Sequence, residues 1–402
     1  MHRLLHTICS FPLLCCIFIA CNTDQPTVAA SPGPRFAEEP KKFGSVQLSY
    51  SDSNSSEWLP IKKSLDSFYG IQARMGFNGS VLIGYKGKIL YERYVGYADR
   101  EQQLPLSPTT PSQLASTSKT FTGAAVLYLH EHKYLNINDP VSHYLKSFPY
   151  PDITVKMLLC HRSGLPDYTH WYGSYVKDTR TPVYNGKILE LMAAKKPPLD
   201  FKPNTRFKYS NTNYAMLGLI IEEATGMPFK TFMKKYIFQP LGMNHTYVFD
   251  PAEGFMQGTT ISYKASWLKE PVMFADGVYG DKGIYSTVED MYRWDQSFYA
   301  NKLLSNETLE LAYGPCSFEK AGVKNYGLGW RMLCYPDGYK IIYHNGWWHG
   351  NNTCFYRFIK DNFTIIVLGN KYTGSIYRQP MAVYKLVNGK EADSTGAEEG
   401  AD

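Results

Sequence analysis

Short runs rich in apolar residues, bounded by turn residues, lie near both ends of the chain, and such runs predict β-strands. Near the N-terminal end, residues 79–84 and 89–95 predict two strands joined by a turn at Lys86-Gly87. Near the C-terminal end, further strands are predicted at 328–335, 341–343, 354–359 and 364–368. We therefore expect one sheet that is built from both ends of the chain.

The segment between these two groups favours helices. Residues 116–132 predict a helix that is apolar nearly all round, which is typical of a buried helix. Shorter helical patches follow, separated by loops rich in Pro, Gly and Asn. The pattern predicts an α+β fold: an antiparallel β-sheet flanked by helices, formed from both chain ends, with an inserted all-helical subdomain. The predicted parts of this domain, 57–390, are a sheet subdomain at 57–132 and 290–390 and a helical subdomain at 133–289.

The first twenty residues predict an export signal. The run from Ile8 to Ala20 is almost wholly apolar, yet it is shorter than the ~20 residues of a comfortable membrane span. It ends in Phe18-Ile19-Ala20-Cys21, which resembles the lipobox of bacterial lipoproteins. Residues 1–20 are therefore expected to be a lipoprotein signal peptide, with Cys21 as the lipidated residue. The alternative is an ordinary cleaved signal followed by an incidental cysteine.

Composition adds a tether and a tail. Residues 21–56 are rich in Pro, Ser, Ala and charge, which predicts a flexible tether, and 391–402 predict a disordered acidic tail. The expected location is therefore the bacterial envelope, lipid-anchored and facing the periplasm or the cell surface. The formal charge of +6 is small and no Lys/Arg run occurs, so nucleic-acid binding is not expected.

Four cysteines fall in the predicted domain: Cys160, Cys316, Cys334 and Cys354. An even number of cysteines in an oxidising compartment permits two disulfides with three possible pairings, and four free buried thiols are the alternative. Cys334 and Cys354 flank a candidate motif and would be able to bridge neighbouring strands. No C-x-x-C spacing occurs, so no zinc site is expected, and no metal or organic cofactor is implied.

The first candidate for chemistry is Ser116-Thr117-Ser118-Lys119. Ser-x-x-Lys occurs four times, but only Ser116 opens the long buried helix. Three residues is nearly one turn, so Ser116 and Lys119 share a helix face. A helix N-terminus favours a forming oxyanion, and a lysine in a dry cleft loses its proton more readily. The alternative is that Ser116 is only a helix N-cap.

Two further motifs supply polar groups. Tyr209-Ser210-Asn211 follows a turn and precedes a helix; a phenol whose pKa is lowered by a nearby lysine would relay protons, although a hydrogen-bonded turn explains the motif equally. His344-Asn345-Gly346 follows a predicted strand, where Gly346 would allow close approach of a backbone or substrate. The amide of Trp347 would then join that of Ser116 in an oxyanion hole, while a surface histidine beside a turn is the alternative.

In this order, with 93 residues from Ser116 to Tyr209 and 135 from Tyr209 to His344, the motifs resemble the serine β-lactamase and penicillin-binding protein superfamily. The closest likeness is to its class C-like branch of D-alanyl-D-alanine carboxypeptidases, D-aminopeptidases and esterases. Flanking segments that resemble the family are 135–141, 153–166, 209–214, 240–243 and 283–287.

The resemblance implies a role for each motif residue. Ser116 would be the acylated nucleophile, Lys119 its activator and Tyr209 the general base and acid. Asn211 would contact Lys119 and the acyl amide of the substrate. His344 stands where class C β-lactamases carry lysine; it resembles peptidase and esterase members, and would present a positive charge to a substrate carboxylate only when protonated.

Aromatic residues also crowd one loop, which resembles a wall of the cleft. This loop contains Tyr168, Trp171, Tyr172 and Tyr175, and Trp347 and Trp348 follow the third motif. Such a wall favours an apolar or ring-bearing acyl group, while ordinary packing is the alternative. Other histidines, namely His161, His170 and His349, are interpreted as ordinary polar residues.

The leading hypothesis is a serine hydrolase that acts through an acyl-serine intermediate on an ester or a D-amino-acid amide or peptide. Its expected partners are a small-molecule or cell-wall peptide substrate and the membrane, through the N-terminal lipid. The alternatives are a β-lactamase and a non-turnover sensor that binds penicillin or cell-wall peptides. Histidine at position 344 points away from efficient β-lactam hydrolysis.

Overall fold

The computed structural model describes residues 44–52 and 55–389. The predicted signal peptide, Cys21, most of the tether and the acidic tail lie outside these residues. Within the described part, no helix is both long and apolar enough to cross a membrane.

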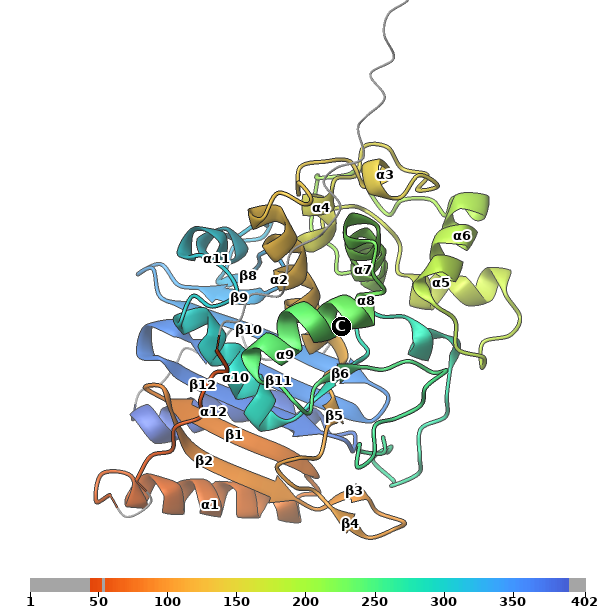
Figure 1. Ribbon diagram of the computed structural model, residues 1–402. Helices are drawn as coiled ribbons and strands as arrows, with labels where there is room; N and C mark the ends of the chain where they lie inside the picture. Colours follow the sequence, from red (N-terminus) through yellow and green to blue (C-terminus); the bar gives the residue numbers. More distant parts are fainter. Residues whose placement is uncertain (1–43, 53–54, 390–402) are drawn as a thin grey trace, which may run out of the picture. The chain divides into compact units, whose positions relative to one another are not determined.

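A seven-stranded antiparallel sheet forms the centre of the fold (Figure 1). The hairpin β1–β2 from the N-terminal part pairs through β1 with β12 from the C-terminal part, in the register Gly79 to Gly369. The prediction of one sheet built from both chain ends is confirmed. In spatial order the strands are β2 (Lys88–Val95), β1 (Gly79–Tyr85), β12 (Phe363–Gly369), β11 (Asn351–Phe358), β10 (Lys340–Trp348), β9 (Arg331–Cys334) and β8 (Lys324–Tyr326).

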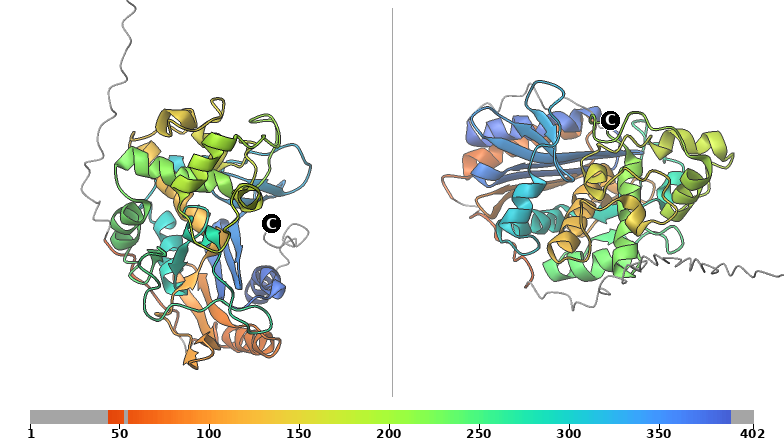
Figure 2. Two further views of the ribbon diagram at one scale, coloured as in Figure 1. Left: turned by 90° about the vertical axis from the view of Figure 1, so that its right-hand side faces the viewer. Right: turned by 90° about the horizontal axis from the view of Figure 1, so that it is seen from above.

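Helices cover both faces of this sheet (Figure 2). Alternate residues of β1 divide between two cores: Val81 and Ile83 contact one cluster, and Leu82 contacts the other. Because both faces are covered, the central strands are buried along almost their whole length. One face packs against α1 (Leu59–Arg74) and α12 (Gln379–Asn388), the other against α2 (Ser118–Glu131) and α10 (Val288–Tyr299); α11 (Asn306–Ala312) lies against α2.

The middle of the chain forms the predicted helical region. It gathers at one end of the molecule, away from α1 (Figures 1 and 2). This region is not purely helical, because β6 (Tyr247–Val248) and β7 (Ile284–Ser286) join β5 (Ser112–Gln113) in a small second sheet. Its helices are α3 (Val141–Tyr144), α4 (Val155–Leu159), α5 (Tyr168–Tyr175), α6 (Asn185–Lys195), α7 (Asn211–Thr225), α8 (Phe229–Phe232) and α9 (Gln239–Leu241). A two-stranded hairpin, β3 (Tyr97–Asp99) and β4 (Leu104–Pro105), extends beyond the main sheet.

The helix α2 runs through the centre of one core. Twelve of its fourteen residues are buried, which confirms the buried helix predicted at 116–132. Phe121 stacks on Trp294 of α10 with ring centroids 4.1 Å apart, which fixes these two helices against each other. The first turn of α2 is therefore held rigidly next to the sheet.

The end of the predicted flexible tether is ordered against the sheet. Residues 49–51 lie along the outer edge of β2: the Ser51 amide donates to the Ile89 carbonyl (2.9 Å), and the Ile89 amide donates to the Ser49 carbonyl (2.7 Å). Val46 is buried in the core, and its amide donates to the Leu241 carbonyl of α9 (3.3 Å). An edge strand has unpaired backbone groups, and this segment satisfies part of them. The tether prediction for 21–56 is therefore wrong for residues 46–51.

The structure also answers the question of a disulfide between Cys334 and Cys354. All four cysteines of the described region are free thiols. Cys334 lies on β9 and Cys354 on β11, and β10 runs between them. Two strand spacings amount to about 9–10 Å, beyond the ~7 Å limit between the Cα atoms of a disulfide. The suggested bridge between these two cysteines is therefore wrong.

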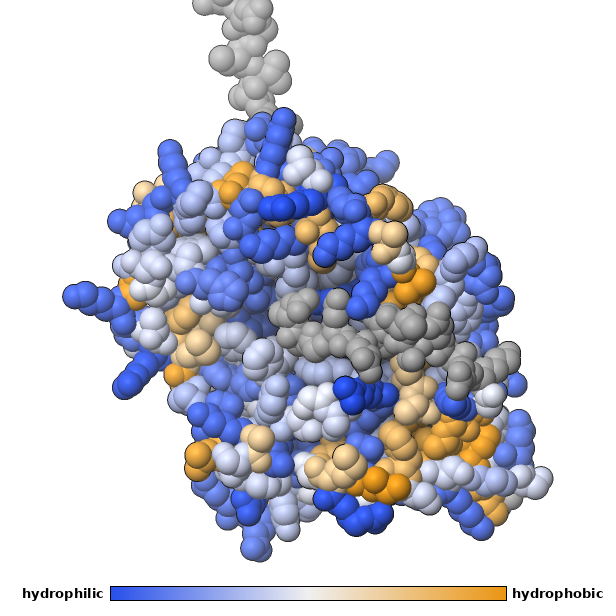
Figure 3. Space-filling view, turned by 180° about the vertical axis from the view of Figure 1, so that it is seen from behind, coloured by the Kyte–Doolittle hydropathy of each residue, from blue (hydrophilic) through white to orange (hydrophobic). Residues whose placement is uncertain are grey.

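The rear surface is mostly hydrophilic (Figure 3). Apolar residues gather there towards the end of the molecule that carries α1. Ile71 and Met75, at and after the C-terminal part of α1, are among the exposed apolar residues. The pocket described next has a different, mixed polar and aromatic lining.

Candidate active site

Ser116 lies in a short, strained turn at the start of α2. This turn is a 3₁₀ segment, Ala115–Thr117, and Ala115 has a left-handed backbone (φ +48°), a conformation that costs energy for a residue other than glycine. Thr117, not Ser116, occupies the N-cap position of α2, and the cap makes no side-chain hydrogen bond. The interpretation of Ser116 as a mere N-cap is therefore wrong, and its hydroxyl lines a pocket instead.

Lys119 contacts the Ser116 hydroxyl from one turn further along. Its Nζ lies 3.0 Å from Ser116 Oγ, 2.8 Å from Asn211 Oδ1 and 2.8 Å from the Asp281 carbonyl oxygen. The side chain is fully buried. The structure thus brings together Ser116, Lys119 and Asn211, which the sequence predicted to meet.

Burial changes the protonation of Lys119. It lowers the pKa of the ammonium to about 8, although the negative charges of Asp281 and Asp167 act in the opposite direction. A neutral amine has two N–H donors and one lone pair. Asn211 Oδ1 and the Asp281 carbonyl accept the two donors, which leaves the lone pair for the proton of the Ser116 hydroxyl. The arrangement is that of a base next to a nucleophile.

Tyr209 is buried on the other side of Lys119. The Lys119 ammonium lies 4.9 Å from the centre of the phenol ring. Burial raises the pKa of Tyr209 well above its ordinary value, while Arg331 and the Ser116 hydroxyl lower it by less. The prediction of a lowered phenol pKa is wrong, because desolvation outweighs the neighbouring positive charges. Tyr209 is therefore a protonated phenol at neutral pH and is suited to donate a proton.

Asn211 is fixed by a carboxylate that belongs to none of the three motifs. Asp167 Oδ2 accepts hydrogen bonds from the Asn211 backbone amide (2.8 Å) and from Asn211 Nδ2 (2.9 Å). Asp167 also caps α5 by accepting from the Thr169 amide. Asn211 is the first residue of α7, so two helix N-termini meet at this carboxylate, which is a favourable place for a negative charge.

The third motif lies on β10 next to the turn that carries Ser116. A Cβ atom at Gly346 would lie 2.4 Å from the Leu114 carbonyl oxygen and 2.3 Å from Thr353 Oγ1. Only glycine leaves room for the backbone before Ser116 to approach the strand this closely. The predicted close approach at Gly346 is confirmed for a backbone. Trp347 follows at the end of β10, where it is half-exposed and lines the pocket.

Comparison with known proteins identifies the family. A family model described as Beta-lactamase matches residues 71–387, a stretch that contains all three motifs. The chain belongs to the β-lactamase family.

Two relatives from Bacillus subtilis (strain 168) show how far the similarity extends. Penicillin-binding protein 4* is 33% identical over 317 residues, which cover 75% of this chain and 70% of that protein. Putative penicillin-binding protein PbpX is 30% identical over 328 residues and covers 78% of this chain and 76% of that protein. The chain is therefore a member of the wider superfamily of β-lactamases and penicillin-binding proteins, as the motifs predicted. Membership supports a serine hydrolase, while the class C-like branch stays a prediction.

Solved structures of this superfamily share the fold. The octameric penicillin-binding protein homologue from Pyrococcus abyssi superposes with a TM-score of 0.69 at 26% identity, covering 82% of this chain and 78% of that one. FmtA from Staphylococcus aureus superposes with a TM-score of 0.66 at 25% identity, covering 86% and 93% respectively. These likenesses confirm an antiparallel sheet flanked by helices.

Within this β-lactamase-family site, His344 does not carry the positive charge that was expected of it. The imidazole is fully buried; Nδ1 lies 2.6 Å from the Asn345 carbonyl and Nε2 lies 3.2 Å from the Tyr326 hydroxyl. Burial, together with the positive charges of Arg331 and Lys119, holds its pKa well below the ordinary value. His344 is therefore neutral at physiological pH, and the predicted pH-dependent charge is wrong.

Arg331 supplies the positive charge near the third motif. It lies on β9, directly opposite Tyr343 of β10, and its guanidinium is 5.0 Å from the centre of the Tyr209 ring. Its charge lowers the pKa values of Lys119, Tyr209 and His344. The sequence contains no motif around Arg331. Only the pairing of β9 with β10 brings it to this site.

His161 is a second residue whose place the sequence did not reveal. It is fully buried, and its ring lies 4.3 Å from that of Tyr209. Its Nδ1 accepts a hydrogen bond from the Ser210 backbone amide (3.2 Å) and lies 3.0 Å from Asn213 Nδ2. His161 thus supports the second motif from behind, and the interpretation of it as an ordinary polar residue is wrong.

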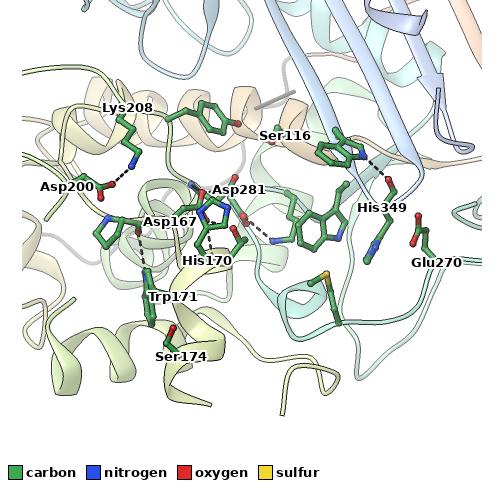
Figure 4. Close-up of a pocket in the computed structure, with 18 residues that line it drawn as sticks. Ser116, Asp167, His170, Trp171, Ser174, Asp200, Lys208, Glu270, Asp281 and His349 are labelled. Atoms are coloured by element: carbon green, nitrogen blue, oxygen red, sulfur yellow. Dashed lines mark hydrogen bonds and ion pairs between the residues drawn. The ribbon is translucent and has the colours of Figure 1, made fainter. Parts of the chain in front are cut away.

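The pocket beside Ser116 is large and has mixed chemistry (Figure 4). Its volume is about 760 Å³. Three tryptophans line it, as the aromatic wall predicted, whereas Tyr168 and Tyr172 are buried in the core. Within the described part of the chain, no three His, Cys, Asp or Glu side chains converge as metal ligands would. The lining residues are Ser116, Pro166, Asp167, Thr169, His170, Trp171, Ser174, Asp200, Lys208, Tyr209, Asn211, Glu270, Met273, Asp281, Lys282, Trp347, Trp348 and His349.

A buried ion pair forms part of the pocket wall. Asp281 Oδ2 accepts hydrogen bonds from Lys282 Nζ (3.0 Å) and from the Tyr168 hydroxyl (2.9 Å). The Lys282 ammonium lies 4.5 Å from the centre of the Trp348 ring. These contacts fix the main chain at Asp281, whose carbonyl accepts from Lys119. The wall therefore positions the base as well as enclosing the substrate space.

Proposed function

We propose that this protein is an exported serine hydrolase that cleaves a D-amino-acid amide or ester through an acyl intermediate on Ser116. The observation that carries the proposal is the position of Lys119. Its buried amine has a pKa of about 8 and lies 3.0 Å from the Ser116 hydroxyl. The names of the two Bacillus relatives support penicillin as a reporter of the same acylation.

In the first step, Lys119 Nζ takes the proton of Ser116 Oγ while that oxygen attacks the substrate carbonyl. The backbone amides of Ser116 and Trp347 receive the oxyanion, since β10 packs against the turn at 115–117. Tyr209, as a protonated phenol, gives its proton to the leaving amine or alcohol. Water then attacks the ester: the Tyr209 phenolate takes a proton from the water, and Lys119 returns its proton to Ser116 Oγ as the acid is released.

The walls of the pocket support an acyl group with a ring or another apolar part. Trp171, Trp348 and Met273 supply apolar surface, and Asn211 Nδ2 supplies a donor for an acyl amide. Near the third motif the positive charge of Arg331, and not a charged imidazole, would attract a substrate carboxylate. A cell-wall peptide carries both an acyl amide and a carboxylate. The predicted lipid anchor at Cys21 would hold the enzyme beside the wall.

The test is to incubate the full chain with benzylpenicillin and to follow the intact-protein mass and the drug together. A lasting adduct on Ser116 would support a penicillin-sensitive peptidase, or a sensor if no peptide or ester is turned over. Loss of drug without an adduct would support a β-lactamase. If the protein mass and the amount of drug both stay unchanged, and panels of esters and D-amino-acid amides also show no turnover, the proposal fails.

Replacing Tyr209 by phenylalanine is expected to lower the acylation rate by ~10²-fold or more. The ring packing against Lys119 and His161 is retained, while the hydroxyl that would protonate the leaving group is lost. Stopped-flow or quench-flow measurement with a chromogenic amide checks this. An ester with a good leaving group needs little protonation and serves as the matched substrate. Its acylation rate should fall by less than that of the amide. An unchanged rate with the amide would remove Tyr209 from the chemistry.

The acylation rate is expected to depend on pH through Lys119. Below its pKa of about 8 the reactive neutral amine is the minor form, so the rate should rise about tenfold per pH unit and level off above pH 8. Burial and the neighbouring positive charges lower the pKa of His344, so no second inflection is expected near the ordinary histidine pKa of 6.5. Rates of acylation by benzylpenicillin between pH 5.5 and 9.5 measure the profile. A flat profile, or a rate that falls with rising pH, would contradict the assignment of Lys119 as the base.

A further inference from the structure

Two thiols that are distant in sequence meet behind the candidate active site. Cys160 follows α4, and Cys316 lies in the segment before β8. Both line one pocket of about 480 Å³, separate from the pocket that contains Ser116. The Cys160 thiol donates to the Lys156 carbonyl (3.0 Å) and the Cys316 thiol to the Gly314 carbonyl (3.6 Å), and the two thiols are close enough to shift each other's pKa. The fold therefore places these two sulfur atoms together without a bond between them.

The backbone around both thiols is already fixed. Arg162, two residues after Cys160, donates from Nη1 to the Cys316 carbonyl (3.0 Å) and forms an ion pair with Glu319. The Cys316 amide donates to the Tyr326 carbonyl (3.0 Å). A cross-link between two segments that are held in place costs little further ordering of the folded chain. The geometry thus favours a bond between these thiols.

The other two cysteines have no such partner. The Cys354 thiol is fully buried and donates to the Ile376 carbonyl at 3.5 Å. Cys334 lies on β9, and β10 separates it from Cys354. Of the three sets of two disulfides that four cysteines permit, two join Cys160 or Cys316 to these strands, and the third needs Cys334 to reach Cys354. One pair alone is placed for bonding.

We propose that Cys160 and Cys316 form a disulfide when the folded protein meets a disulfide oxidant, and that this bond joins the helical region to the sheet. Cys160 immediately precedes His161, which supports Tyr209. Cys316 pairs with Tyr326, whose hydroxyl lies 3.2 Å from His344 Nε2. The bond would therefore join the two segments that support the second and third motifs. It is a covalent modification site outside the catalytic machinery, and it does not depend on the proposed reaction.

The order of reaction follows from exposure. Cys316 is partly exposed, and its interaction with Cys160, with Lys156 and Arg162 nearby, lowers the pKa of its thiol. Its thiolate attacks one sulfur of the oxidant, breaks the oxidant's S–S bond and releases one thiol. The Cys160 sulfur then gives up its proton, attacks Cys316 Sγ and releases the second thiol. Two protein thiols are oxidised, and the oxidant disulfide is reduced to two thiols.

Tryptic peptides of this sequence distinguish the possible disulfide pairings. After oxidation by oxidised glutathione, alkylation and tryptic digestion without reductant, each cysteine falls in a different peptide. These are 157–162 for Cys160, 303–320 for Cys316, 332–340 for Cys334 and 341–357 for Cys354. We expect 157–162 and 303–320 to appear as one linked species that separates on reduction. Cys334 and Cys354 should stay reduced.

Cys160→Ser, Cys316→Ser and Cys334→Ser form the matched set. Oxidation should raise the Tm of the wild type and of Cys334→Ser by about 5 °C or more, since the bond closes a loop of more than 150 residues, from 160 to 316. It should leave the Tm of the other two variants unchanged. The proposal is overturned if 157–162 and 303–320 remain separate and fully alkylated after oxidation, or if Cys316 is recovered linked to the peptide 332–340.

Discussion

Ser116→Ala is expected to abolish both hydrolysis of any substrate and the penicillin adduct, while the protein stays folded. The Ser116 hydroxyl is the only group that the proposed reaction makes covalent, so alanine leaves no oxygen to carry the acyl group. Removing the nucleophile of an acyl enzyme typically lowers the rate by many powers of ten. Intact-protein mass spectrometry after incubation with benzylpenicillin, together with turnover of an amide and an ester, measures both effects.

Ser174→Ala is the matched control for this prediction. Ser174 begins a second Ser-x-x-Lys sequence, lies in α5 and lines the same pocket, yet its hydroxyl makes no hydrogen bond to a lysine of the described residues. This variant should keep its activity within a few-fold of the wild type. An adduct that persists in Ser116→Ala but disappears in Ser174→Ala would move the nucleophile to α5. Full activity in Ser116→Ala would end the proposed mechanism.

Lys119→Met is expected to lower the acylation rate by about 10³-fold, within the range for loss of a general base. Methionine has a similar length but no amine, so the Ser116 proton has no acceptor. The remaining acylation rate should no longer depend on pH. The Asn211 and Asp281 oxygens lose a donor, but an expensive buried amine is also removed, so the Tm should change by only a few degrees.

Lys208→Met is the control for Lys119→Met. It shows whether the loss of any lysine from the pocket lowers the rate, or only the loss of the base. Lys208 also lines the pocket, but its side chain is largely exposed and pairs with Asp200 at 2.7 Å. Its replacement should change the rate by less than about threefold, as for an exposed ion pair. If Lys119→Met retains a tenth or more of the wild-type rate and the same pH profile, another group is the base.

Local pattern predicted six of the seven strands of the central sheet, because these strands bury apolar side chains, but it did not predict the short strands β3 to β7. The short apolar runs in 79–84 and 89–95 correspond to β1 and β2, and the longer apolar run after Ser116 corresponds to α2. The three-residue strand β8 has too few residues for a visible pattern. Residues 46–51 were expected to be flexible, because their sequence has no apolar pattern that predicts a strand. Their order comes from backbone hydrogen bonds to the edge of β2.

The candidate site was predicted in its residues and only partly in its chemistry. Ser116, Lys119 and Asn211 converge as the motif order implied. The protonation of Tyr209 and His344 did not follow the prediction, since both depend on burial, which a motif does not contain. Arg331 and Asp167 have no motif and reach the site through strand pairing and a helix cap.

The sequence by itself determined which elements form and which residue types can react, because periodicity and spacing are local properties. It also determined the family, because the motifs and their flanking segments are written in order along the chain. Only the tertiary structure decided which groups are charged and which thiols can meet. A pKa depends on desolvation and on charges within a few ångströms, and a disulfide depends on two backbones within about 7 Å. Both are distances through space between residues that can be more than a hundred positions apart in sequence.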